Sequence, residues 1–239
     1  MPGVGTLVNA IAIIAAGATG CLAGNKIPQK MQDTLMKANA LAVLFLGVAG
    51  VIAKMLTISD GSLSTSGTMM MVISLALGAV VGELLDIEEK FNTFGEWLKV
   101  KTGNARDKNF VNAFVTASLT VCIGAMAVIG SIQDGMYGDH SILFAKAVMD
   151  FIIVLVMSAS MGKGCAFSAI PVAVVQGCMT ALARLLQPLM TDAAMTNLSL
   201  VGSVLIFAVG VNLLWGKKVR VANLLPALVV AVVMAYIHI

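Results

Sequence analysis

The sequence predicts an all-α, polytopic membrane protein, a single transmembrane domain that covers residues 1–239. Three observations predict this fold class. Hydrophobic residues make up 59% of the chain and charged residues 11%, whereas roughly a quarter of an ordinary soluble domain is charged. Apolar residues gather in about eight stretches, each long enough to cross the ~30 Å hydrocarbon layer as a helix. Basic residues are concentrated in alternate loops.

The connections between the apolar stretches are too short to hold an independent core. The longest polar interval covers 87–109, and the others run from a few residues to about fifteen. The first stretch has no basic n-region and no clear small-residue cleavage site, so we expect a retained helix rather than a signal peptide. The eight stretches are 4–24, 38–58, 67–86, 110–132, 142–162, 165–186, 198–216 and 219–238.

The distribution of Lys and Arg predicts the direction in which the chain crosses the membrane. The loops after the first, third, fifth and seventh stretches hold twelve of the fifteen basic residues, and the opposite loops hold only Lys54 and Arg184. By the positive-inside rule, both termini lie outside the cytoplasm. The net charge of +3 is modest and lies in the inner loops, which predicts contact with anionic membrane lipid and not with nucleic acid. The twelve are Lys26, Lys30, Lys37, Lys90, Lys99, Lys101, Arg106, Lys108, Lys163, Lys217, Lys218 and Arg220.

The polar interval after the third stretch begins with an amphipathic pattern. Ile87, Phe91, Phe94 and Leu98 follow one another at spacings of four, three and four, so they share one face of a helix. Lysines and a tryptophan lie beside this stripe, as in helices that lie in the membrane interface. We therefore expect an interfacial helix over 87–101; the alternative is a docking surface for a cytoplasmic partner.

Similar spacings of Gly, Pro, Asp and Met residues in the two halves of the chain indicate an internal repeat. Gly17 and Gly177 are each followed eleven residues later by a proline, Pro28 and Pro188, then by an Asp, a Met and an apolar run. Helices 1–3 would thus match helices 6–8. Because the offset is an odd number of helices, the two units would be inverted, as in many secondary transporters. The alternative is a chance likeness between runs of Gly, Ala, Val and Leu.

The fifth stretch holds two charged residues one turn apart. Lys146 and Asp150 share a helix face and can neutralise each other, and Asp150 is the only carboxylate placed so near the middle of a stretch. An acid at this depth is expensive unless it is paired or hydrated. It is either a functional ion or proton site or half of a structural ion pair, and the sequence supports both readings.

The connection after the fifth stretch combines a glycine-flanked lysine with a helix breaker. Lys163 lies between two glycines, and Pro171 removes a hydrogen-bond donor about one turn into the sixth stretch. Irregular backbone in a membrane must face protein or a water-filled cavity. Backbone amides at 165–168, together with Ser168, would suit an anion. The alternative is a proline kink in a tight hairpin.

Two large amide side chains lie within apolar stretches that belong to matched members of the repeat. Asn9 is in the first and Gln176 in the sixth. They are candidates for the polar lining of a site, or for hydrogen bonds between helices.

Glycines four residues apart occur twice, at Gly20 with Gly24 and at Gly78 with Gly82. This GxxxG spacing lets helices approach closely, either within the chain or between the subunits of a homo-oligomer.

Motifs of catalysis and cofactor binding are missing from the sequence. It has no nucleophile with a matching base, no HExxH, no dinucleotide fingerprint and no nucleotide-binding loop, so we expect no enzyme and no cofactor. The cysteines have neither CxxC spacing nor a neighbouring histidine, so we expect no metal site. They are Cys21, Cys122, Cys165 and Cys178.

Four segments together resemble a known family. They are GTLVN at 5–9, IGSIQDG at 129–135, FSAIPV at 167–172 with QG at 176–177, and VANLLPA at 221–227. With these segments the chain resembles, over almost its full length, the bacterial integral-membrane family known as domain of unknown function 554. The resemblance implies a multi-pass protein of the bacterial cytoplasmic membrane. It supplies no activity for any residue.

These patterns favour a secondary transporter or channel-like carrier of an ion or small polar solute. Asp150 would be the coupling-ion or proton site with Lys146 beside it, and Asn9, Ser168 and Gln176 would line the path. One alternative is a membrane scaffold or sensor that does not transport and uses helix 87–101 as its output surface. Another is a lipid-handling enzyme or flippase, which would need a polar lateral opening.

Overall fold

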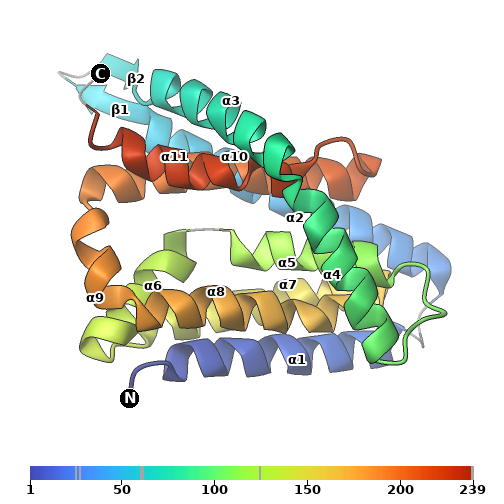
Figure 1. Ribbon diagram of the computed structural model, residues 1–239. Coiled ribbons are helices and arrows are strands. Elements are labelled where there is room, and N and C mark those ends of the chain that lie inside the picture. Colours follow the sequence, from blue (N-terminus) through green and yellow to red (C-terminus); the bar gives the residue numbers. More distant parts are fainter. Residues whose placement is uncertain (25, 27, 60–61, 124, 238–239) are drawn as a thin grey trace. The chain divides into compact units, whose positions relative to one another are not determined.

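The computed structural model describes residues 1–24, 26, 28–59, 62–123 and 125–237, and this part of the chain is almost entirely helical (Figure 1). The long helices are α1 (Val4–Gly24), α2 (Gln29–Met55), α3 (Thr68–Leu85), α4 (Ile87–Lys101), α5 (Phe110–Cys122), α6 (Ala125–Tyr137), α7 (Ser141–Met161), α8 (Ala169–Ala181), α10 (Asp192–Trp215) and α11 (Pro226–Met234). The short elements are α9 (Ala183–Leu186), the 3₁₀ helices η1 (Lys163–Ser168), η2 (Gln187–Leu189) and η3 (Val221–Leu224), and the strands β1 (Leu56–Ser59) and β2 (Ser62–Thr65).

The helices form two compact units. Unit 1 consists of residues 1–40 and 89–186, and unit 2 consists of residues 41–88 and 187–239. The chain passes between the units within α2 and within α4, and again between α9 and η2.

In unit 1, α1 and α7 run in the same direction. Gly5 near the start of α1 contacts Leu143 near the start of α7, and Gly24 at the end of α1 contacts Ala159 near the end of α7. The buried face of α1 repeats every three or four residues, as an amphipathic helix requires. Its opposite face exposes apolar side chains, among them Leu7, Ile11 and Ile14.

Helices α5 and α6 together run opposite to α1, and so does α8. At one end Gly164 contacts Phe110 at the start of α5, and at the other end Gly135 near the end of α6 contacts Thr180 near the end of α8. Helix α5 ends at Cys122, and the two helix axes meet at 63°. The pair thus behaves as one broken helix that covers the length of the unit.

In unit 2, α3 and α10 run in the same direction, while α2 and α11 run opposite to them. Along α2, Gly47 contacts Phe207 and Gly50 contacts Ser203, so sequence numbers rise on one helix as they fall on the other. Helix α11 returns along α10, where the Asn197 side chain donates a hydrogen bond of 3.1 Å to the Ala231 carbonyl. These contacts define a bundle of four helices.

The two GxxxG segments pack within the chain. A Cβ added at Gly20 or Gly24 would overlap with the backbone of α7, and one added at Gly78 or Gly82 would overlap with α11 or η3. Glycine is required at these positions because the neighbouring backbone occupies the space of a side chain. Of the two uses left open by the sequence, the structure shows the contact within the chain.

The hairpins α7–η1–α8 and α10–η3–α11 share the same order of features. Each long helix ends at a glycine with positive φ, 95° at Gly162 and 76° at Gly216, a conformation that side-chain-bearing residues rarely adopt. A lysine and a 3₁₀ helix follow each glycine, and a proline lies near the start of each returning helix, Pro171 and Pro226. The two hairpins, one in each unit, therefore have similar local structure.

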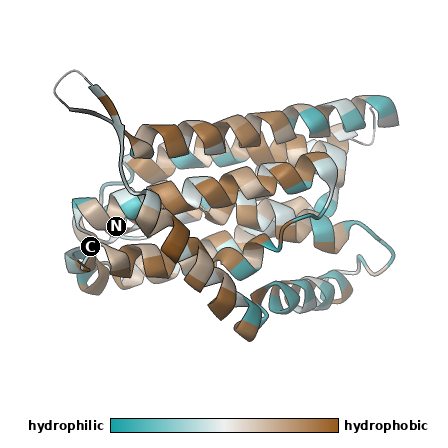
Figure 2. Ribbon diagram, turned by 90° about the horizontal axis from the view of Figure 1, so that it is seen from above, coloured by the Kyte–Doolittle hydropathy of each residue, from teal (hydrophilic) through white to brown (hydrophobic). Residues whose placement is uncertain are grey.

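Helix α4 covers the range that the sequence predicted. In unit 1, Leu98 from this helix packs with Phe110 and Phe114 of α5, and the Phe94 ring lies 5.8 Å from the Phe114 ring. Trp97 is 54% exposed, so the helix has one packed face and one open face. Figure 2 shows hydrophobic residues along most of the long helices and hydrophilic residues gathered near helix ends and loops.

The structure shows an all-α, multi-pass membrane protein. Among the described residues, six helices are long and apolar enough to cross a membrane, or seven if the α5/α6 pair is one span. They differ from the eight predicted stretches at two places. The fourth stretch, 110–132, is broken into α5 and α6, and the eighth, 219–238, contains only the nine-residue α11 after η3.

A two-stranded hairpin between α2 and α3 was not predicted. Strands β1 and β2 pair antiparallel, with Leu56 opposite Thr65. Helix α2 also begins at Gln29, nine residues before the predicted apolar stretch, because the polar residues of 29–37 are good helix formers.

Candidate functional site

The two charged residues predicted on α7 form a buried ion pair. The Lys146 Nζ donates hydrogen bonds of 2.9 Å and 2.7 Å to Oδ1 and Oδ2 of Asp150. Only 7% of Lys146 and 3% of Asp150 are exposed. The pair lies one turn apart on the face of α7 that is directed into unit 1, as the spacing of four residues predicts.

Asn9 of α1 joins this pair. Its Nδ2 donates a hydrogen bond of 2.9 Å to Asp150 Oδ2, and the residue is fully buried. Asn9 faces inward because it lies on the face of α1, between Gly5 and Gly20, that packs along α7. Residues 141 positions apart in the sequence are thereby brought into contact.

The third contact of the ammonium group comes from the broken helix. Lys146 Nζ donates a hydrogen bond of 2.8 Å to the backbone carbonyl of Val121. In an uninterrupted helix this carbonyl would accept a bond from the N–H group four residues later. Since α5 ends at Cys122, the Val121 carbonyl is available to the lysine. All three donors of the ammonium group then have acceptors.

Several polar atoms of unit 1 are buried and have no hydrogen-bond partner within the described residues. They lie on α1, α6 and α8, three helices that pack against one another. An unpaired buried polar group costs roughly 1–3 kcal/mol unless water or a ligand satisfies it. The atoms are Thr6 Oγ1, Asn9 Oδ1, Ser131 Oγ, both amide atoms of Gln176, and Thr180 Oγ1.

Ser168 and Gln176 have different surroundings from the ion pair. The Ser168 hydroxyl donates a bond of 2.7 Å to the Cys165 carbonyl within its own turn. Gln176 is 1% exposed on α8. Within the described residues, no hydrogen bond joins either side chain to Lys146 or Asp150, so the structure brings together three of the five predicted residues.

Asp134 on α6 is a buried polar residue that the sequence analysis missed. Its carboxylate accepts bonds of 3.0 Å and 3.1 Å from the backbone N–H groups of Gly3 and Gly5, and it lies 2.8 Å from Nδ1 of His140. The carboxylate thus satisfies the first free amides of α1 and faces the positive end of that helix. An Asp two residues beyond the end assigned to the fourth stretch was the available signal.

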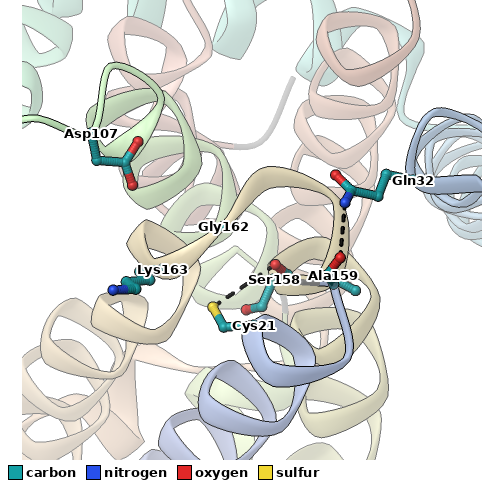
Figure 3. A pocket seen from close by; sticks show the side chains of 8 residues that line it. Cys21, Gln32, Asp107, Ser158, Ala159, Gly162 and Lys163 are labelled. Carbon is teal, nitrogen blue, oxygen red and sulfur yellow. Dashed lines mark hydrogen bonds between the residues drawn. The ribbon is translucent and has the colours of Figure 1, made fainter. Parts of the chain in front are cut away.

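A cavity of about 190 Å³ opens at the other end of α7 (Figure 3). It lies more than a turn beyond Asp150, and its lining includes neither Asp150 nor Asn9. Ser158 lines it with an Oγ that is buried and has no partner in the part of the chain that the structure describes, and Gln32 donates a bond of 2.9 Å to the Gly24 carbonyl at its edge. The lining residues are Cys21, Gly24, Gln32, Asp107, Ser158, Ala159, Gly162 and Lys163.

The acidic residues and potential soft ligands are dispersed. In the part of the chain that the structure describes, no three His, Cys, Asp or Glu side chains lie together as a metal ion would require. The polar centre of unit 1 therefore consists of an ammonium group, a carboxylate, an amide and a backbone carbonyl. Such a set can bind a proton or a small cation, or orient a polar solute.

Comparison with known proteins gives the family but no activity. The chain is 28% identical to "Uncharacterized protein YqgA" of Escherichia coli (strain K12), over 95% of this chain and 94% of that protein. It is 27% identical to "Uncharacterized membrane protein YdfK" of Bacillus subtilis (strain 168), over 98% of this chain and 96% of that protein. No solved structure matches the chain. The family model described as "Protein of unknown function (DUF554)" matches residues 4–236, so the chain belongs to this family, as the sequence motifs predicted.

Proposed function

We propose that the protein is a secondary transporter or channel-like carrier of an ion or small polar solute in the bacterial cytoplasmic membrane. Asp150 is the coupling-ion or proton site. The observation that supports this best is the Lys146–Asp150–Asn9 network, which lies buried where α5 and α6 form a broken helix. Secondary transporters commonly place ion sites at interrupted helices, whose free backbone groups act as ligands.

A purely structural ion pair explains less of the arrangement. A structural pair would use the Val121 carbonyl too, because the third donor of a buried ammonium group needs an acceptor. It leaves unexplained the amide of Gln176, which has no partner among the described residues. A hydrated path explains this amide, since water or solute would satisfy its polar atoms. Asn9, Ser168 and Gln176 are the proposed lining.

The directions of the helices support eight crossings, which place both termini on the same side of the membrane, and the distribution of Lys and Arg predicts that this side is the outside. Since α1 and α7 run in the same direction, an odd number of crossings must separate them, and α2, α3 and the α5/α6 pair supply three. Likewise α3 and α10 run in the same direction, with the pair, α7 and α8 between them. The short α11 with η3 is the eighth. Helix α4 then lies at the inner interface, with its lysines near lipid phosphates.

The inverted repeat is part of the proposal. It pairs α1, α2 and α3 with the segments that begin at η1, α10 and η3. The likeness between the two hairpins α7–η1–α8 and α10–η3–α11 offers a competing pairing, in which the repeated units have the same orientation. Superposing the two sets of helices in an experimentally determined structure of the whole chain distinguishes the pairings.

A membrane scaffold or sensor is the second candidate function, and the exposed side of α4 favours it. Trp97 is 54% and Val100 is 66% exposed on that side, so a partner has apolar groups to bind. The burial of Lys146 and Asp150, which are 7% and 3% exposed and outside the lining of the cavity in Figure 3, also agrees with this alternative, in which the pair is sealed in a dry core. We propose transport and not catalysis, with membrane lipid and the solute as partners; a homo-oligomer is compatible with either function.

A flux assay separates the two functions. The purified full chain is reconstituted in liposomes and tested against a panel of labelled monovalent cations, amino acids and other small polar solutes, with and without a pH gradient. Flux above that of empty liposomes supports transport, and loss of that flux in Asp150→Asn places the site. If no member of the panel moves, but a cytoplasmic protein binds through Trp97, the scaffold function is favoured.

A further inference from the structure

The Lys146 ammonium group has the surroundings of a bound monovalent cation. Three oxygens lie 2.7–2.9 Å from Nζ: both carboxylate oxygens of Asp150 and the Val121 carbonyl. A carboxylate together with an unwound backbone carbonyl is the ligand set with which interrupted transporter helices bind sodium ions. In this chain the cation among these oxygens is the ammonium group of Lys146, which is covalently part of the protein.

Asn9 would supply a further oxygen to the same place once its side-chain amide turns over, since Nδ2 and not Oδ1 faces Asp150. Its Nδ2 is bonded to Asp150, while its Oδ1 is buried and has no partner among the described residues. An amide oxygen is a hard ligand of the kind that alkali and alkaline-earth cations prefer. Removing the lysine side chain would therefore leave a negatively charged pocket with several oxygen ligands at the break in the helix.

We propose that Lys146 is a tethered cation, which fills a monovalent-cation site formed by Asp150, the Val121 carbonyl and Asn9. The native protein then needs no metal ion at this site. Replacing Lys146 by a small neutral residue opens the site to a small alkali cation such as Na⁺. This inference rests on the proposed role of Asp150 as the ion site, and it names what fills that site in the native protein: the ammonium group of Lys146 in place of a metal cation.

The charges around the site support replacement by a single positive charge. Asp150 supplies one negative charge, and Asn9 and Val121 supply neutral groups. Cys122, next to Val121, is close enough to interact electrostatically with both members of the pair, but a thiol carries no positive charge. A monovalent cation therefore restores neutrality, whereas a divalent cation leaves an excess positive charge in an apolar span.

The test compares thermal unfolding of purified full-length variants in chloride salts of Na⁺, Li⁺, K⁺ and choline at equal ionic strength. Wild type is expected to unfold at the same temperature in all four salts. Lys146→Ala is expected to unfold earlier in choline, and Na⁺ or another alkali cation should raise its unfolding temperature by several degrees in a saturable way. Lys146→Ala/Asp150→Asn, which lacks the carboxylate, should lose this cation-specific rise.

Three results would overturn the proposal. One is a Lys146→Ala protein that responds equally to alkali cations and choline. Another is wild type showing the same cation-specific rise, because a filled site has no room for a second cation. The third is failure of Lys146→Ala to fold in any alkali salt while the double variant folds, since a cation should then have replaced the amine.

This test is independent of transport. Saturable cation binding by Lys146→Ala with no flux by wild type for any solute would support the tethered cation and refute the transport function. Flux by wild type without cation binding by the variant would do the reverse. Where flux is found, the proposal further expects wild-type flux to be unchanged when choline replaces Na⁺, and Lys146→Ala to require Na⁺.

Discussion

The Lys146 ammonium group donates a 2.8 Å hydrogen bond to the carbonyl of Val121, one residue before α5 ends. This contact joins the one buried lysine of α7 to the break between α5 and α6. It couples the ion pair to backbone geometry: if Lys146 leaves Asp150, the Val121 carbonyl loses its partner as well. In the proposed transporter, a change of protonation at Asp150 would therefore act on the lysine that is bonded to the end of α5.

The Asn9 contact should contribute measurably to stability. Replacing Asn9 by Leu removes the donor to Asp150 and leaves a carboxylate oxygen with one fewer bond. We expect a loss of about 1–3 kcal/mol in the free energy of unfolding, which is about 2–12 °C in unfolding temperature for a chain of this size. Thermal unfolding in detergent measures it. Thr19→Ala, on the exposed side of the same helix, is the control and should change the temperature little.

Close packing of α1 on α7 gives a second prediction. Gly20→Ala places a methyl group where the Leu155 carbonyl and Ser158 lie, so we expect destabilisation of about 1–3 kcal/mol. Gly177→Ala on α8 meets no atom within 4 Å and should be neutral or stabilising by about 0.5–1 kcal/mol. Thermal unfolding of the two variants and wild type under the same conditions measures the difference in stability. Equal effects would mean that α1 does not pack on α7 as described.

The carboxylate of Asp134 should hold the start of α1. Asp134→Asn keeps the size of the side chain but removes the charge that accepts bonds from Gly3 and Gly5. We expect about 1–2 kcal/mol of destabilisation and faster hydrogen exchange at the first amides of α1. Glu96→Gln, at an exposed pair on α4, should stay within about 1 kcal/mol of wild type. Unchanged hydrogen exchange at residues 3–5 would show that Asp134 does not cap α1.

Membrane topology is testable by labelling single cysteines in a variant whose four native cysteines are replaced. A cysteine at Thr102, exposed after α4, should react with an impermeant maleimide only from the cytoplasmic side. A cysteine at Asp139, exposed before α7, should react only from the outside, and a reporter fused after Ile239 should behave as extracytoplasmic. The reverse pattern would refute the threading and the inverted direction of the repeat.

Sequence reasoning predicted the long helices well because they depend on composition. The predicted range 4–24 coincides with α1, and 142–162 differs from α7 by one residue at each end, since continuous apolar runs define both. The ion pair between Lys146 and Asp150 was also predicted by their spacing of four residues. Asn9 was predicted as a site residue, but its partner depends on the packing of α1 on α7, which a single helix pattern does not contain.

The features that were missed depend on short-range backbone signals within apolar or polar runs. The break after Cys122 lies in a stretch whose hydropathy is continuous, so only an isolated glycine at 124 pointed to it. The β1–β2 hairpin had a clearer signal, because Asp60 and Gly61 separate two runs rich in Thr, Ser, Ile and Leu. A prediction based on apolar stretches alone therefore missed both the break and the hairpin.

Flux through Asp150→Asn in proteoliposomes, measured beside wild type, Lys146→Met and Lys146→Met/Asp150→Asn, decides whether Asp150 is the coupling site. We predict that Asp150→Asn inserts and folds but moves no solute that wild type moves, because it has no acid to exchange partners. Lys146→Met should retain more flux than Asp150→Asn, and the double variant should fold without transporting. Full flux through Asp150→Asn would contradict this account. So would unfolding of both single variants with flux restored in the double variant, since the pair would then serve structure alone.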